Sequence, residues 1–410
     1  MTNNSKHLRI VNRLNWYRLA SPSSDNDLPI YNWYPYKHGY ARGLVSNLID
    51  EMSIKPGMNV LDVFCGGGTT LLTCQEKGIQ SLGIDITPFA VFLCNTKLDN
   101  YNYNKVLKYI EYFKRNGTEI VDYPGTDIVT IEKAFNKKML NYLYSLKKEI
   151  DKVEEEKYKN LLLLAFFSIL EESSKTSKSG GFLRLVERNT NPKLSQELFM
   201  SRLESFAKDI KNAKRNIKLA EARVGDSRYF NTKMLFDAVI TSPPYPNRHD
   251  YTRIYLLELA FGFINEDDKI KELRYKTIRS HVEAKSPYKI DRRYTPSRYL
   301  KSLVGKIKKR KPNNNMIEDM LYGYFEDMYI TLKNMKRFLK KGARVAFVVS
   351  NVRYCGINVP VDKLLARTGE AAGLSTEKII VMRYRGNTPQ QIIKYKRKPS
   401  RESVVIWKYN

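Results

Sequence analysis

The chain has 410 residues, of which 42% are hydrophobic, so it can form one large core domain with insertions or two domains. Its formal net charge of +28 favours a polyanionic partner, nucleic acid before an anionic membrane surface. The polar first residues and the shortness of the apolar runs predict neither a signal peptide nor a membrane span. A cytoplasmic, nucleoid-associated protein is therefore expected.

The spacing of cysteine and histidine predicts no metal site. The four cysteines form no Cys-x-x-Cys pair, and the four histidines are scattered along the chain. This pattern indicates reduced thiols of a cytosolic protein, with neither a zinc site nor a disulfide framework.

Residues 1–30 are predicted to form a basic N-terminal arm, to which the sequence assigns no fixed structure. Residues 31–100 start with closely spaced aromatic side chains, which we interpret as a lid or packing surface. An amphipathic helix follows, with Leu44, Val45, Leu48 and Ile49 on one face.

A glycine turn between a strand and a helix is the first chemical motif. A strand over residues 58–64 leads into Cys-Gly-Gly-Gly-Thr-Thr at 65–70, a helix begins at Leu71, and a second strand ends at Asp85. Glycines allow close backbone approach to a ligand, and a helix N-terminus offers free N–H groups. Asp85 stands where a ribose hydroxyl needs an acceptor. Leu71 replaces the third glycine of the dinucleotide fingerprint, which argues against NAD.

Residues 101–220 are predicted to be a helical insertion, because apolar stripes alternate with Lys and Glu. The insertion is broken at 173–181 by the basic, hydroxyl-rich segment Ser-Ser-Lys-Thr-Ser-Lys-Ser-Gly-Gly. This loop is either a phosphate clamp, with Lys178 contacting nucleic acid, or an ordinary linker.

The segment 221–264 carries the second motif, Thr241-Ser242-Pro243-Pro244-Tyr245, after the apolar run 236–240. Alone, this pattern is most simply a strand that stops at a rigid Pro-Pro turn. At the C-terminal edge of a sheet, however, the Ser242 oxygen and the Pro243 carbonyl can accept the two hydrogens of an exocyclic amine. That would localise the nitrogen lone pair for attack, while Tyr245 stacks on the extruded base.

The segments after Tyr245 are strongly basic. Arg248 and Arg253 are either phosphate contacts beside the extruded base or part of an exposed loop. Residues 265–320 form a second, basic insertion with interleaved tyrosines, containing Arg292 and Arg293. This composition favours a target-recognition region on nucleic acid over a disordered basic loop. Residues 321–410 return to the core, and the last two strands lack a crossover helix, so they should be antiparallel.

The two motifs together resemble a known family. Asp62-Val-Phe64-Cys-Gly66-Gly-Gly68-Thr69-Thr is similar to the first motif of class I S-adenosylmethionine (AdoMet)-dependent methyltransferases. With Thr241–Tyr245 after it and Gly225-Asp226 between, the chain resembles the DNA amino-methyltransferases, which methylate cytosine N4 or adenine N6. The resemblance covers most of the chain outside 101–220 and 265–320. It implies an α/β, Rossmann-like fold with a mostly parallel seven-stranded sheet, an antiparallel edge hairpin and the two insertions.

The resemblance also implies roles for single residues. The AdoMet pocket would be lined by Asp62, Phe64, Gly66, Gly68 and Thr69, with Asp85 on the ribose and Asp226 near the adenine. Lys37 and His38 would pack over the methionine end. The residues that match the catalytic motif are Ser242, Pro243, Pro244 and Tyr245.

A serine before Pro-Pro-Tyr usually accompanies cytosine N4 in this family, so N4 methylation of double-stranded DNA is the expected activity. C5 methylation is disfavoured, because the chain contains no Pro-Cys. The alternatives are adenine N6 methylation, an RNA amino-methyltransferase on the same fold, and a DNA-binding protein with a vestigial cofactor fold. A monomer that serves a restriction-modification system, with a cognate restriction endonuclease, is expected. The recognition sequence stays open, as does which insertion reads it.

Overall fold

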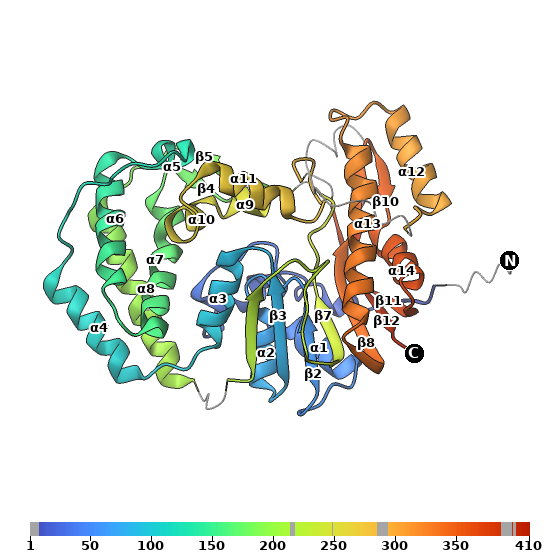
Figure 1. Ribbon diagram of the computed structural model, residues 1–410, viewed down its shortest axis with the longest axis horizontal. Helices are drawn as coiled ribbons and strands as arrows, with labels where there is room; N and C mark the ends of the chain where they lie inside the picture. The colour runs from blue at the N-terminus through green and yellow to red at the C-terminus, as the bar shows by residue number, and fades with distance from the viewer. Residues whose placement is uncertain (1–7, 214–217, 248, 285–293, 387–395, 397–398) are drawn as a thin grey trace.

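The computed structural model describes residues 8–213, 218–247, 249–284, 294–386, 396 and 399–410. An eight-stranded sheet forms its centre, in the order β1-β11-β12-β8-β7-β2-β3-β6 (Figure 1). Its strands are β1 (Ile10–Asn12), β2 (Asn59–Asp62), β3 (Gln80–Asp85), β6 (Ala220–Val224), β7 (Phe236–Thr241), β8 (Leu339–Ser350), β11 (Ser375–Arg385) and β12 (Ser400–Lys408). In this sheet β12 is antiparallel to both neighbours, and the other pairings are parallel. The predicted mostly parallel sheet with an antiparallel hairpin is confirmed, and β1 is an additional strand.

Helices cover both faces of the sheet, as its buried, near-continuous apolar strands require. Alternate side chains of one strand point to opposite faces. Val60 packs in the cluster with α1 (Arg42–Glu51), whereas Leu61 packs in the cluster with α13 (Ile317–Lys336) and α14 (Val361–Ala371). The layer of α1 continues through α2 (Thr69–Glu76) and α3 (Pro88–Leu98).

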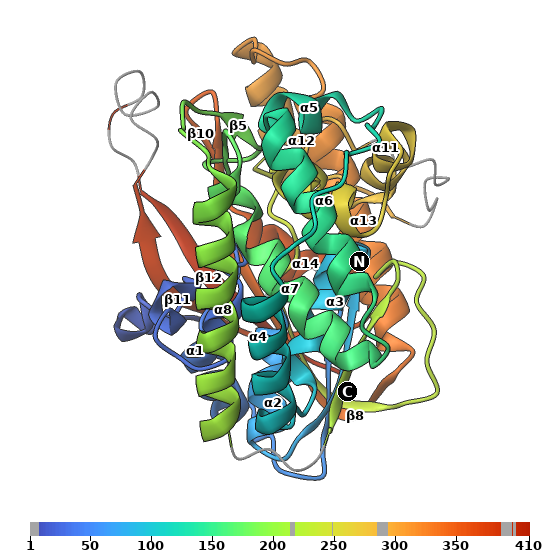
Figure 2. The same ribbon diagram turned by 90° about the vertical axis from the view of Figure 1, so that its left-hand side faces the viewer.

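The first insertion is helical, as its apolar stripes indicate (Figure 2). Its elements are α4 (Tyr103–Asn116), α5 (Val129–Ala134), α6 (Lys137–Asp151), α7 (Glu156–Ser173), the short hairpin β4 (Thr176–Ser177) and β5 (Arg184–Leu185), and α8 (Pro192–Asn212). The buried apolar side chains of these helices form one cluster with those of α3 and of the aromatic segment, including Trp33 and Phe89. The insertion therefore shares its core with the cofactor half of the sheet.

The second insertion follows two short helices, α9 (Tyr251–Ile254) and α10 (Leu256–Gly262). It contributes α11 (Asp267–Lys276) and α12 (Arg298–Lys309), and a small hairpin of β9 (Val352–Tyr354) and β10 (Ile357–Val359) lies in the part of the chain that follows. The apolar face of α12, with Leu300, Leu303, Val304 and Ile307, is buried in the cluster that includes α13. Its charged face is left exposed.

Residues 8–30, which belong to the segment to which the sequence assigned no structure, form part of the fold. β1 pairs in parallel with β11, and the short 3-10 turns η1 (Leu14–Trp16), η2 (Pro22–Asp25) and η3 (Tyr31–Trp33) follow. Trp16 is buried beside α1, and the carboxylate of Asp25 accepts the Arg42 N–H at 2.6 Å, at the start of that helix. This segment is therefore part of the fold rather than a free arm.

Two negative findings hold for the residues described above. None of their helices is long and apolar enough to cross a membrane. They also contain no cluster of three or more His, Cys, Asp or Glu side chains that could hold a metal ion.

Candidate active site

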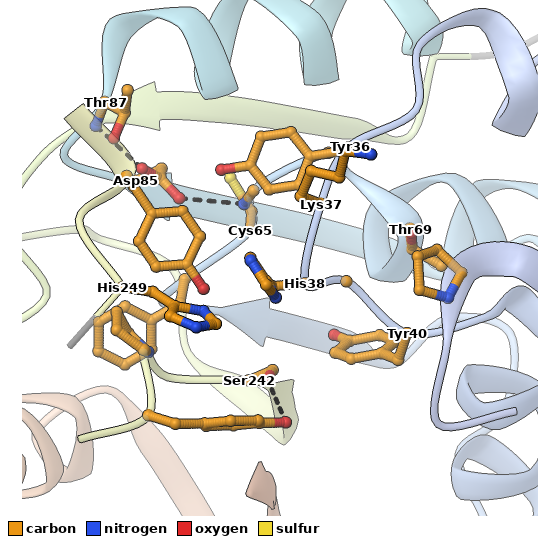
Figure 3. A pocket seen from close by; sticks show the side chains of 18 of the residues that line it. Tyr36, Lys37, His38, Tyr40, Cys65, Thr69, Asp85, Thr87, Ser242 and His249 are labelled. Carbon is orange, nitrogen blue, oxygen red and sulfur yellow. Dashed lines mark hydrogen bonds between the residues drawn. The ribbon is translucent and has the colours of Figure 1, made fainter. Parts of the chain in front are cut away.

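A cavity of about 740 Å³ lies at the carboxyl ends of β2, β3, β6 and β7, where open α/β sheets bind their ligands. Residues from both sequence motifs line it, including Phe64, Gly66, Asp85, Ser242 and Tyr245. Figure 3 shows Asp85 and Ser242 on opposite sides of the cavity. The fold therefore brings residues of the predicted cofactor set and of the predicted catalytic motif to one site.

Asp85 holds the glycine turn in place. One oxygen of its carboxylate accepts the Gly66 N–H at 3.0 Å, and the other accepts the Thr87 N–H at 2.9 Å (Figure 3). Burial raises the pKa of Asp85, and the two backbone N–H groups oppose that effect. The carboxylate still lines the cavity, so it is placed to accept a hydrogen bond from a hydroxyl group of a bound ligand.

Tyr36 covers the glycine turn and leaves no room for a side chain at two of its positions. A Cβ at Gly66 would come within 2.8 Å of the Tyr36 ring, and one at Gly67 within 2.9 Å of the Tyr36 Cβ. The Tyr36 ring stacks on Tyr255 with 4.7 Å between centroids and 15° between planes. This contact is the packing surface that the aromatic segment predicts.

Two residues expected at the cofactor have other contacts. Gly68, with φ of +82°, starts α2 so close to α3 that an added Cβ would lie 2.6 Å from the sulfur of Cys94. Asp62 is buried and accepts the Thr241 hydroxyl at 2.6 Å and the Phe64 N–H at 3.1 Å. Burial raises the pKa of Asp62 to about 6. Neither residue lines the cavity, whereas Phe64 and Thr69 do.

Asp226 lines the cavity, but its charge is already paired. Its carboxylate binds Arg228 at 2.7 Å, and Arg228 also reaches Asp327 at 3.1 Å. Arg228 further donates to the Lys276 carbonyl at 2.6 Å, at the end of α11. Asp226 can still accept a hydrogen bond from a ligand, but it is one member of a buried ionic network that reaches the second insertion.

The Ser-Pro-Pro-Tyr turn is held from several sides. The Ser242 hydroxyl lies 3.2 Å from the Val348 carbonyl and 3.4 Å from the Tyr245 hydroxyl, to both of which it can donate. Tyr354 donates to the Pro246 carbonyl just beyond the turn. Because the single Ser242 proton points to these acceptors, its oxygen lone pairs stay available to accept. Burial also raises the pKa of Tyr245, which therefore stays a neutral ring.

The two prolines of the turn differ in position. Pro244 lines the cavity beside Ser242 and Tyr245, whereas Pro243 is buried and does not line it. The role expected for the Pro243 carbonyl stays a prediction.

The residues predicted to contact nucleic acid divide into three groups. Lys178 is buried, with its amine 2.5 Å from Glu258 and 2.7 Å from the Tyr34 hydroxyl, which argues against a phosphate contact. Arg253 is exposed and lies over the Phe182 ring at 5.8 Å from its centroid. Arg248, Arg292 and Arg293 lie outside the described residues.

The cavity contains a histidine pair, of which the sequence pattern indicated His38 but not His249. Lys37 and His38 line it as expected, and the Lys37 N–H donates to the Tyr255 hydroxyl at 2.7 Å. His38 faces His249, with 4.3 Å between ring centroids (Figure 3). A histidine so close after the Ser-Pro-Pro-Tyr motif was the signal that could have identified His249.

The sheet order, with β12 inserted antiparallel between β8 and β11 and a glycine turn after β2, defines a class I AdoMet-dependent methyltransferase. The N6/N4 DNA methylase family matches residues 15–95. The chain is 33% identical to the type II methyltransferase M.BsoBI of Geobacillus stearothermophilus, over 98% of this chain and 90% of that protein. It is 30% identical to the type II methyltransferase M.AvaI of Nostoc sp., over 95% of this chain and 89% of that protein. The chain therefore belongs to the DNA amino-methyltransferase family.

Among solved structures, a TehB-like SAM-dependent methyltransferase from Corynebacterium glutamicum covers 89% of this chain and 87% of its own, with 10% identity and a TM-score of 0.30. That likeness is slight, and the fold assignment rests on the strand order.

The family and the fold imply AdoMet as the methyl donor, and the cavity fits it. Asp85 offers a hydroxyl acceptor at the end of β3, Phe64 offers an apolar face, and Gly66 allows close approach of the backbone. The volume falls within the range of pockets that hold ligands of this size, roughly 300–1,000 Å³.

Proposed function

We propose that the protein methylates the N4 amine of cytosine within a specific site in double-stranded DNA, using AdoMet. The observation that carries this proposal is the acceptor oxygen of Ser242 beside the neutral ring of Tyr245, in the cavity that also contains Asp85. Bound AdoMet supplies an electrophilic methyl group. Because an amine inside a duplex cannot reach this cavity, the target base would have to be extruded.

The residues of the chain would act by positioning. Ser242 accepts a hydrogen from the exocyclic amine and directs the nitrogen lone pair, and Tyr245 stacks on the base. Asp85 and Phe64 hold the cofactor on the opposite side. Fixing both reactants in line can supply roughly 7–11 kcal/mol of the barrier reduction where the geometry is near ideal.

The biological setting follows from the relatives, which are named type II methyltransferases. By that similarity, the protein would be the modification enzyme of a restriction-modification system in the cytoplasm, with a cognate endonuclease that cleaves the unmodified site. It would act as a monomer, because one target base enters one active site in each event.

The test incubates the purified protein with AdoMet and unmethylated DNA, followed by digestion to nucleosides and mass spectrometry. N4-methylcytosine is the expected product, and Ser242→Ala and Tyr245→Ala should abolish turnover while AdoMet still binds. N6-methyladenine would keep the site and overturn the choice of base. Product on tRNA or rRNA alone would overturn DNA as the substrate.

A further inference from the structure

Methylation of an exocyclic amine creates a proton that has to leave, and this inference rests on the function proposed above. When the N4 lone pair forms its bond to the methyl group, the nitrogen carries the methyl, two hydrogens and a positive charge. One N–H bond must then break, its electron pair returning to nitrogen. A positioned acceptor for that proton accelerates such a step.

The carboxylates that line the described part of the cavity are already engaged. Asp25 accepts the Arg42 backbone N–H at 2.6 Å, and Asp85 accepts two backbone N–H groups. Asp226 is paired with Arg228 at 2.7 Å, and Glu402 with Arg383 at 2.5 Å. Each of these carboxylates already accepts backbone N–H groups or binds a cation, so none of them is the open acceptor that this step needs.

His281 also lines the cavity, but its hydrogen bond places its lone pair on a buried ring nitrogen. The Thr277 hydroxyl donates to the Arg274 carbonyl at 2.7 Å, so the His281 Nε2 at 3.1 Å must itself donate to Thr277. The lone pair of His281 is therefore on Nδ1. That atom is buried and has no hydrogen-bond partner among the described residues, so a substrate in the cavity does not reach it.

The geometry points to His249, supported by His38, as the acceptor of the proton that leaves the methylated amine. The two rings lie 4.3 Å apart between Asp85 and Ser242 (Figure 3). The backbone N–H of His249 donates to the Asn247 side-chain oxygen at 3.2 Å, which orients the loop that follows Ser242. A ring nitrogen of His249 takes the proton, and the N–H electron pair stays on N4.

The surroundings keep both imidazoles neutral before the reaction, so each ring carries a lone pair. Burial, and then the charges of His38 and Arg385, together lower the pKa of His249 to about 4. Burial, Arg385 and Lys37 lower the pKa of His38, whereas a hydrogen bond to the Gly180 backbone raises it. An imidazolium beside Arg385 is unfavourable, so the proton passes on to water and the site resets for the next turnover.

The experiment measures single-turnover methyl transfer to the unmethylated DNA of the assay above, started by adding AdoMet to the preformed complex of enzyme and DNA. His249→Ala should lower the rate by about 10²-fold or more, with AdoMet and DNA affinities unchanged, and added imidazole should restore much of it. His249→Gln, which keeps polarity and size but not basicity, should be as slow. The restored rate should follow the basicity of substituted imidazoles.

A rate for His249→Ala within threefold of wild type would overturn the role of His249 alone. So would a loss that imidazole does not restore, because it would indicate a structural role. Absence of methyl transfer by the wild-type protein to any DNA would instead refute the proposed function itself, so the two failures are distinguishable.

Discussion

Replacing Lys178 by Met should lower the stability of the folded protein rather than weaken its contact with DNA. The Lys178 amine and the Glu258 carboxylate form an ion pair at 2.5 Å, with side-chain exposures of 4% and 0%. Tyr34 donates to the same Glu258 oxygen at 2.8 Å, and the other Glu258 oxygen is buried with no hydrogen-bond partner among the described residues. Removing the amine leaves a buried, uncompensated carboxylate, which costs about 3–5 kcal/mol.

The assay is denaturant unfolding, run as a double-mutant cycle. Lys178→Met should lower the free energy of unfolding by that amount, whereas Lys178→Met with Glu258→Met should recover most of it, because a buried ion pair is often replaceable by apolar side chains of similar volume. Lys218→Met serves as a matched control, since its pair with Asp99 is exposed to solvent. The free energy of unfolding of this control should equal that of the wild type within the error of replicate measurements.

The opposite result would support the sequence-based interpretation of Lys178 as a phosphate contact. If Lys178 contacts a phosphate, Lys178→Met should be as stable as the wild type. The slope of log K against log salt for DNA binding should then fall by the amount that corresponds to about one phosphate contact. Unchanged stability of the single variant would refute the reasoning from burial.

Two further predictions concern the cofactor pocket and the basic face of α12. Asp85→Ala should weaken AdoMet binding in calorimetry, because it removes the hydroxyl acceptor and frees the Gly66 and Thr87 N–H groups; wild-type affinity would contradict this role. Lys301→Gln with Lys306→Gln and Lys309→Gln, all exposed on α12, should lower the slope of log K against log salt for DNA by up to about 2.7, at about 0.9 per lost phosphate contact. A slope like that of the control Lys108→Gln on α4 would show that α12 does not contact DNA.

The sequence was informative where structure is decided locally. Glycines, prolines and apolar runs mark the turn after β2 and the turn after β7 within a few residues, and the missing crossover before β12 predicts an antiparallel strand. A strand of three residues such as β1 has no periodicity to detect. It exists because β11 offers an edge, which is a property of the assembled sheet.

Buried charges were the part that sequence could not predict. Lys178 in a basic, hydroxyl-rich loop has the composition of a phosphate contact, but its partner Glu258 lies 80 residues further along the chain. Asp226 likewise has the composition of a free acceptor, but its partner Arg228 also binds Asp327, which lies on a separate segment about 100 residues further along the chain. Such pairings depend on which helices pack together, and no local pattern encodes that.

Asp62 shows why the two motifs act as one site. The sequence interpretation gave it a contact with the cofactor, whereas the structure gives its carboxylate to the hydroxyl of Thr241, 179 residues away. Thr241 immediately precedes Ser242, so this bond fixes the end of the catalytic strand against the end of the strand that carries the glycine turn. A shift of either strand would change the separation between the position proposed for the amine, at Ser242, and the position proposed for the methyl donor, beside Phe64. Because in-line transfer tolerates little displacement, a buried hydrogen bond between the two strand ends is a direct way to keep that separation constant.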